Sequence, residues 1–242
     1  MIASTHWPDL LFAGLTVFAG ALVQGCTGAG LGMVAAPILL LINPLFVPGP
    51  LLALGVLLCV MICVREWQSI DRRGLSIALV GRIAGSIFAG CTFSLLSIAG
   101  YDLLFGILVL GAVLLSNTGW RARPTVSNLL TAGTVSGFMG TLTTIGSLPI
   151  VLVYQHDAPA TIRSTIAAYL ALGASFSLAV LATVGKFGSA QILTSLLFLP
   201  PMAAGFWISN HVIPHMNPTR TRRAVLGVAG ASAIVLISKA LL

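Results

Sequence analysis

Long apolar runs separated by short polar breaks dominate the sequence. A membrane-spanning helix needs about 20 predominantly apolar residues, with a range of roughly 17 to 25. Half of the eight runs have such lengths, and proline, glycine, asparagine or charged residues separate the runs. The pattern predicts an all-helical polytopic membrane protein. The runs are Leu10–Ile42, Pro50–Val64, Leu75–Ile98, Asp102–Ser116, Asn128–Tyr154, Ile166–Val184, Ile192–Ile213 and Ala224–Leu242.

Two of these runs contain glycine-rich interruptions that share one spacing. Each interruption has two glycines three residues apart and a proline nine residues further on, and an offset of 112 residues superimposes them. We therefore expect one membrane domain, residues 1–242, with a first repeat at 1–122 and a second at 123–242. Each repeat would hold one broken segment followed by three ordinary helices. The matched positions are Gly25, Gly28 and Pro37, and Gly137, Gly140 and Pro149.

The basic residues indicate whether the broken segments cross the membrane or return to the side they came from. Cytoplasmic loops of membrane proteins carry an excess of Lys and Arg. Two crossing segments would put seven basic loop residues inside and four outside, whereas two re-entrant hairpins give nine inside and two outside. The hairpin arrangement is favoured, and it places the N-terminus outside and inverts the second repeat relative to the first. Inverted repeats with discontinuous helices are typical of secondary transporters.

Composition excludes the soluble protein classes. Of 242 residues, 57% are hydrophobic and 7% are charged, whereas about 25% are charged in soluble domains. The net charge of +7 does not indicate a nucleic-acid partner, because the basic residues lie in short groups between apolar runs. The four cysteines show no zinc-binding or CxxC spacing, so we expect no metal or other cofactor. A signal peptide is not expected either, since no basic residue precedes Arg65.

The glycine-rich interruptions are the first candidate binding site. A helix that begins inside the membrane has N–H groups without intrahelical partners and the positive end of the helix dipole. Glycines there let an oxyanion approach the backbone, and nearby hydroxyl and amide groups add donors. Alternatively, the glycines serve only close helix packing. The candidate residues are Gln24, Thr27, Gly28, Gly30, Gly32, Thr143, Thr144 and Ser147.

Arg82 is the second candidate. It lies eight residues beyond Gly74, which is about 12 Å along a helix, and a charge at that depth usually faces a cavity or the bundle interior. We expect it to attract or bind an anion, although it could instead snorkel to the interface or bond to carbonyl groups. Arg163, near the cytoplasmic mouth, could gather anions or simply anchor the topology. The sequence shows no P-loop, and its five acidic residues all lie at the ends of predicted helices or in loops, so no buried carboxylate is expected to relay protons.

Two motifs carry a family resemblance. The segments GALVQGCTGAGLGMVAAP and GTVSGFMGTLTTIGSLP, together with PIVLVYQHDAPATIR, resemble the sulfite exporter TauE/SafE family, also called toluene-sulfonate uptake permeases. The second motif departs from the family's frequent GIGGP. The resemblance implies multi-pass transport of sulfite, sulfoacetate or sulfonates, commonly in the bacterial inner membrane.

These observations together predict a secondary transporter that exports small sulfur-containing anions. The substrate would bind between the two hairpin tips near the membrane midplane. The protein would be embedded in the lipid bilayer, either as a monomer or as a homo-oligomer. Two alternatives remain: a membrane scaffold or assembly factor without a substrate, and an intramembrane sulfur-transfer enzyme with Cys26 as nucleophile. The enzyme is disfavoured because no His or acidic residue lies near Cys26 in the sequence to act as a base.

The topology can be tested at the loop around His215. The re-entrant arrangement places this loop in the cytoplasm, because it contains three of the nine inside basic residues. A reporter enzyme that is active only in the cytoplasm, fused at His215, should therefore be active. Activity of a reporter that works only outside the cytoplasm would contradict the arrangement.

Overall fold

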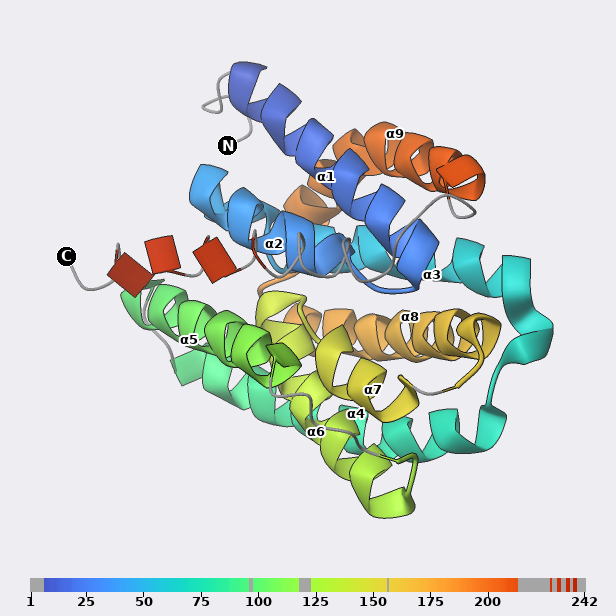
Figure 1. Ribbon diagram of the computed structural model, residues 1–242. Helices are drawn as coiled ribbons and strands as arrows, with labels where there is room; N and C mark the ends of the chain where they lie inside the picture. The colour runs from blue at the N-terminus through green and yellow to red at the C-terminus, as the bar shows by residue number, and fades with distance from the viewer. Residues whose placement is uncertain are drawn as a thin grey trace.

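The computed structural model describes residues 7–95, 98–117, 123–155 and 157–212, with a few isolated residues between 227 and 238. This part of the chain is helical, as predicted (Figure 1). Five of its helical segments are long and apolar enough to cross a membrane: Trp7–Thr27, Pro44–Ser69, Arg72–Leu95, Pro159–Thr183 and Ser189–Val212. The last predicted run, Ala224–Leu242, lies almost entirely outside the described residues, as do Arg220, Arg222, Arg223 and His215.

The first broken segment folds as two antiparallel helices. Helix α1 (Trp7–Thr27) ends one residue before Gly28, and α2 (Leu31–Ile42) runs back along it (Figure 1). Gly28 and Gly30 have φ values of 84° and 156°, a conformation that side chains strongly disfavour. The predicted interruption is therefore present, and glycine is required at both of its turning positions.

The second broken segment has the same form but a different register. Helix α6 (Val126–Thr143) is followed by α7 (Ser147–Tyr154). An offset of 112 residues maps Thr27 onto Met139, yet α6 continues for one more turn beyond Met139. The two breaks are thus not equivalent residue by residue, and the inverted relation of the repeats stays a prediction.

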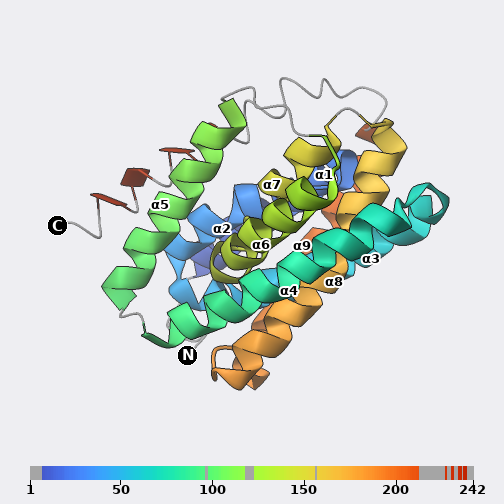
Figure 2. The same ribbon diagram turned by 90° about the horizontal axis from the view of Figure 1, so that it is seen from below.

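The other helices follow the predicted runs closely. Helix α8 begins seven residues before its apolar run, because Pro159 suits the first helical position. Helix α8 lies between α3 and α4 and contacts both (Figure 1 and Figure 2). The remaining bounds are α3 (Gly49–Glu66), α4 (Arg72–Leu95), α5 (Ile98–Asn117), α8 (Pro159–Thr183) and α9 (Ser189–Val212), with short 3-10 helices η2 (Pro44–Phe46) and η3 (Trp67–Ser69).

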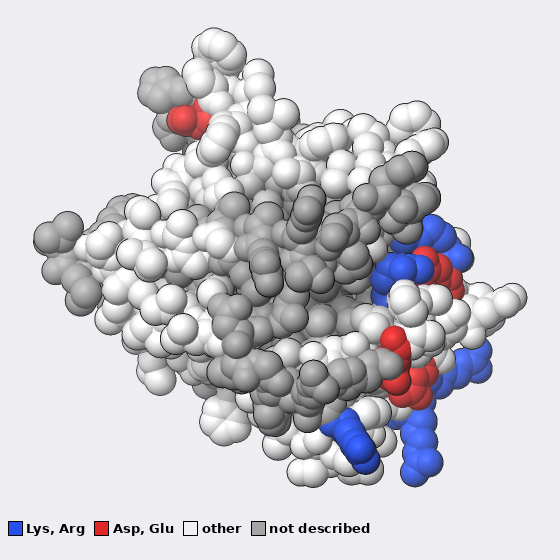
Figure 3. Space-filling model, in the orientation of Figure 1, with Lys and Arg blue, Asp and Glu red and all other residues white. Residues whose placement is uncertain are grey.

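Charged side chains gather at one end of the molecule. Figure 3 shows them where α3 ends and α4 begins, and an ion pair between Glu66 and Arg163 brings the start of α8 to the same place. Lys186, between α8 and α9, lies at the opposite end, next to Phe93 near the end of α4. The described basic residues are thus separated as the hairpin topology expects, and the assignment of the Arg-rich end to the cytoplasm stays a prediction.

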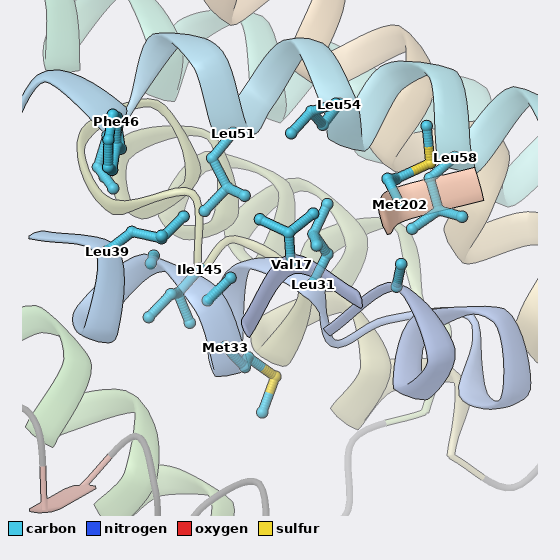
Figure 4. Close-up of a cluster of buried hydrophobic side chains, with 14 of the residues drawn as sticks. Val17, Leu31, Met33, Leu39, Phe46, Leu51, Leu54, Leu58, Ile145 and Met202 are labelled. Carbon is cyan, nitrogen blue, oxygen red and sulfur yellow. The ribbon is translucent and has the colours of Figure 1, made fainter. Parts of the chain in front are cut away.

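The largest apolar cluster joins α3 to the first hairpin and to the second break. In Figure 4, Leu51, Leu54 and Leu58 of α3 lie on one side, with residues of α1 and α2 opposite them. Ile145 reaches this cluster from the second break and Met202 from α9. The cluster therefore holds the two hairpins in fixed positions relative to each other.

Helices α4 and α6 pack in parallel with their backbones in contact. Glycines lie at the contact on both helices, and a Cβ added to any of them would overlap a carbonyl oxygen of the facing helix. Gly137 faces the Arg82 carbonyl, so this crossing fixes where Arg82 lies. Small residues that allow such approach are common at membrane helix interfaces. The four glycines are Gly81, Gly85, Gly133 and Gly137.

A similar parallel contact joins α1 to α9. Gly205 faces the Phe18 carbonyl, and Gly25 faces Ser209 further along both helices. The spacing of Gly205 from Pro201 matches that of Gly85 from Gly81. When Gly81 is matched to Pro201 and Gly85 to Gly205, Arg82 is matched to Met202. Met202 is buried in the apolar core.

The α4–α6 contact predicts that a single methyl group is harmful at Gly85. Gly85→Ala should lower the free energy of unfolding by about 1–3 kcal/mol, because the added Cβ meets the Thr134 carbonyl and forces the helices apart. The matched control is Gly111→Ala in α5, where an added Cβ meets nothing within 4 Å. Thermal unfolding in detergent measures both. Equal melting temperatures for the two variants would contradict the prediction.

Candidate functional site

A small cavity lies where the first turn of α2 meets the second break. Its volume is about 40 Å³, and one water needs about 10–15 Å³ of such volume, so it has room for about three water-sized groups. Leucines of α2, α3 and α8 form much of the wall. The polar side chains that line it are Gln24, Cys59, Arg82 and Thr144.

Arg82 is buried in this cavity wall with 1% of its surface exposed. Its Nη1 donates to the carbonyl and the hydroxyl of Ser136, at 3.3 and 3.1 Å. The guanidinium lies over the Tyr169 ring, 5.3 Å from its centroid, and the buried Nε has no hydrogen-bond partner. Among the described residues the ion pairs all involve Glu66, and none reaches Arg82. Arg82 therefore does not snorkel, and its charge has no carboxylate partner here.

Three glycines from different elements make room for the guanidinium. A Cβ at Gly140 or Gly146 would lie 3.0 or 2.9 Å from Nη1, and one at Gly173 would overlap Nε. These glycines come from α6, the second break and α8, so the slot forms only when all three elements are assembled. The second glycine-rich interruption thus serves Arg82 itself.

Gln24 caps the first turn of α2. Its Oε1 accepts a hydrogen bond from the Leu31 N–H at 2.9 Å, and its Nε2 donates to the Cys59 Sγ at 3.1 Å. One of the N–H groups expected to be free at the start of α2 is therefore already bonded. Gly32, also in the cavity lining, lies directly against the Thr144 carbonyl, where a side chain would overlap.

Thr144 occupies the turn of the second break. Its φ of 63° is left-handed, a conformation that is costly for a β-branched residue. Its backbone N–H donates to the Gly140 carbonyl at 3.0 Å and ends α6, while its buried Oγ1 has no partner. Strained residues of this kind cluster at functional sites. Thr144 and Arg82, each with a buried side-chain atom that has no hydrogen-bond partner, both belong to the lining of this cavity.

The other polar candidates at the breaks bond locally and lie outside the cavity lining. The Thr27 hydroxyl is bonded to the Val23 and Ala29 carbonyls, and the Thr143 hydroxyl is bonded to the Met139 carbonyl and the Ile145 N–H. The Ser147 hydroxyl donates to the Met33 sulfur at 3.7 Å. These residues shape the two turns. Their role in substrate binding remains a prediction.

Gly28, Gly30 and Arg163 lie at the first break, away from the cavity. Gly28 packs against the backbone of Arg163 and Gly30 packs against Val23. Gly173, beside the Arg82 slot, is ten residues beyond Arg163 on α8, which is about 15 Å along a helix. The first break thus lies nearer the Arg-rich end than the cavity does. The second hairpin is contacted by the first turn of α2, not by the first break.

An ion network holds the first break at that end. Arg163 donates from Nε to both carboxylate oxygens of Glu66 at 3.1 Å. Arg65 donates to the Gly25 carbonyl at 2.8 Å and to the Asn210 side chain at 2.7 Å. The charge of Arg163 is therefore balanced by Glu66, and the network links α1, α3, α8 and α9.

Four residues of the site were not anticipated from the sequence. The spacing of Cys59 indicates no metal or redox role, and Tyr169 and Gly173 carry no signal in the sequence. Ser136, which holds both Arg82 and the Gly146 carbonyl, is offset from Gln24 by the repeat distance of 112. The repeat register could therefore have indicated Ser136 as the counterpart of Gln24.

Comparison with known proteins decides the family. A family model described as sulfite exporter TauE/SafE matches residues 12–236. The chain belongs to this family. Comparisons with curated proteins and with solved structures found no match. Family membership indicates a multi-pass membrane transporter of a small anion rather than an enzyme. The Sγ of Cys26 contacts the Ser209 carbonyl at 3.8 Å, and Cys26 does not line the cavity.

The strain at Thr144 gives a stability prediction for this family member. Thr144→Gly should raise the free energy of unfolding by about 1 kcal/mol, because glycine adopts a positive φ without the clash of a branched side chain. Thr144→Ala, which also lacks the hydroxyl but keeps a Cβ, should raise the free energy of unfolding by a smaller amount. Thermal unfolding in detergent distinguishes them, and a lower melting temperature for Thr144→Gly would refute the strain argument.

Proposed function

We propose that this protein is a secondary transporter that exports small sulfur-containing anions such as sulfite, sulfoacetate or sulfonates. The substrate binds in the cavity between the first turn of α2 and the second break, against Arg82. The observation that carries the proposal is the Arg82 guanidinium, which is buried, has an unpartnered Nε and has no carboxylate partner among the described residues.

A buried charge without a counterion is costly, and Arg82 is only partly compensated. Ser136 accepts two hydrogen bonds from Nη1, and Tyr169 supplies a cation–π contact. Neither supplies negative charge, and the cost of an isolated buried ion is much larger than that of a neutral polar group. An oxyanion in the cavity would supply both the missing charge and an acceptor for Nε.

Two further groups support an oxyanion in the same place. The Thr144 hydroxyl is buried without a partner and is free to donate to a second oxygen. The α2 helix, whose first turn lines the cavity through Leu31 and Gly32, directs the positive end of its dipole there. These donors come from three different elements, as expected for a site that is built by the tertiary fold.

The cavity size favours a compact head group. Room for about three water-sized groups suits the oxygens of a sulfite or sulfonate. An organic substituent would have to lie along the apolar wall formed by Leu51, Leu52 and Leu170. We therefore expect small sulfonates to be accepted more readily than aromatic ones.

Outward transport agrees with the energetics of an anion. Leaving a cell that is negative inside yields about 2.3 kcal/mol per charge per 100 mV. The residues described as lining the cavity include no carboxylate that could relay protons, so the proposal requires no proton coupling. It also places the protein in the bacterial inner membrane with its N-terminus outside.

The role of Arg82 can be tested by sulfite efflux from proteoliposomes. Arg82→Gln should reduce flux by more than about 100-fold, because losing one partner of a buried charge pair costs about 3–5 kcal/mol. The matched control is Arg73→Gln, which removes an exposed charge from the start of the same helix and should leave flux unchanged. Both variants are first checked for unaltered thermal unfolding. Wild-type flux in a folded Arg82→Gln variant would exclude this site.

A further inference from the structure

We infer that the cavity selects its substrate by charge, binding a monoanion and rejecting a dianion of the same size. This inference rests on the proposed anion site and specifies what that site accepts. It distinguishes bisulfite from sulfite, and simple sulfonates from sulfate or from a sulfonate that also carries a carboxylate. Among the anions proposed above, the inference thus favours bisulfite and singly charged sulfonates over sulfoacetate, which has two charges near neutral pH.

The cavity offers a single positive charge. Arg82 is the one charged side chain among the described residues that line it. Gln24 and Thr144 are neutral, and the titratable groups facing Arg82 or the cavity are the Cys59 thiol and the Tyr169 phenol. Thiol and phenol groups carry no charge near neutral pH. A bound monoanion would thus form a neutral pair with Arg82.

The charged cluster at the first break lies too far from the cavity to act on a bound anion. Its own positive and negative charges also largely balance one another. Glu66 lies between Arg65 and Arg163 at the first break, and Arg163 is about 15 Å along α8 from the level of the Arg82 slot. Arg65 has its own partners in the Gly25 carbonyl and the Asn210 side chain. This cluster cannot neutralise a second charge in the cavity.

The second half of the chain contributes no counterpart of Arg82 at the matching place. In the α1–α9 contact the residue at the corresponding position is Met202, 2% exposed. Figure 4 shows Met202 among apolar side chains, next to Leu58. The two halves therefore meet at the cavity with one cation between them rather than two.

The buried polar groups of the cavity that have no hydrogen-bond partner are also too few to bind a dianion. The buried groups without a partner at the cavity are the Arg82 Nε and the Thr144 Oγ1, while the Gln24 amide is already bonded to Leu31 and Cys59. A second charged oxygen would face leucine side chains. Placing an unpaired charge against apolar groups is strongly unfavourable, so the dianion is excluded by desolvation rather than by size.

Methanesulfonate and sulfate test this inference directly. Both are compact tetrahedral sulfur anions of similar size, but near neutral pH one carries a single charge and the other carries two. In proteoliposomes containing the full chain, methanesulfonate flux should exceed sulfate flux at least about tenfold at equal concentration, a ratio that corresponds to about 1.4 kcal/mol. Protein-free liposomes correct for leakage.

The pH dependence of sulfite flux is the second arm. Bisulfite loses its proton near neutral pH, so acidifying the loaded compartment converts the dianion into the monoanion and should raise the flux of total sulfite. Methanesulfonate flux should stay constant over the same range, because its charge does not change. A sulfite flux that is flat or rises with pH would overturn the inference.

A gain-of-function variant completes the design. Gly55 lines the cavity from α3, and a Cβ added there meets nothing within 4 Å, so a longer side chain can be accommodated. Gly55→Lys adds a second positive charge and should raise sulfate flux relative to methanesulfonate, whereas Gly55→Ala should keep the wild-type preference. An unchanged preference in a folded Gly55→Lys variant would contradict selection by charge.

The outcomes separate the two proposals. Equal methanesulfonate and sulfate flux, with both lost in Arg82→Gln, would overturn charge selection and leave the anion site in place. Absence of flux for every sulfur anion in the folded wild-type protein would overturn the proposed function, and this inference with it.

Discussion

The close parallel contact between α4 and α6 is the constraint on which the rest of the site depends. Four glycines allow the two backbones to touch, and this contact places Arg82 beside Ser136 and beneath the second break. A guanidinium carried on α4 could not reach Gly140 and Gly146 if side chains separated the helices. The packing of α4 on α6 and the position of Arg82 are therefore one feature.

The sequence predicted what depends on local pattern. The two interruptions and the helical runs follow from hydropathy and glycine content, and they are confirmed for the described residues. Arg82 is buried in the helix bundle, while its depth in the membrane stays a prediction. The turn at Thr144 could not be predicted, because a threonine in left-handed conformation carries no local signal. The parts played by Cys59 and Tyr169 depend on which helices become neighbours, and this information is not contained in the periodicity of a single segment.

The two hairpins share a plan but perform different tasks in the structure. The first break is built from glycines and is held by the Arg65, Glu66 and Arg163 network at the charged end of the molecule. The second break lies deeper, carries the strained Thr144 and forms part of the slot for Arg82. The proposed asymmetry of charge at the cavity agrees with this difference, since Arg82, the one cation among the described lining residues, comes from the first half.

The glycine slot around Arg82 also restricts which cation can occupy it. A guanidinium is planar, stacks on aromatic rings and presents its donors in a fixed plane, whereas a lysine ammonium is compact and strongly hydrated. The slot between Gly140, Gly146 and Gly173, with the Tyr169 ring against it, matches the flat shape. Lysine would leave part of this space unfilled and bring water of hydration into an apolar surround. The fold thus specifies arginine by shape, and positive charge alone is not sufficient.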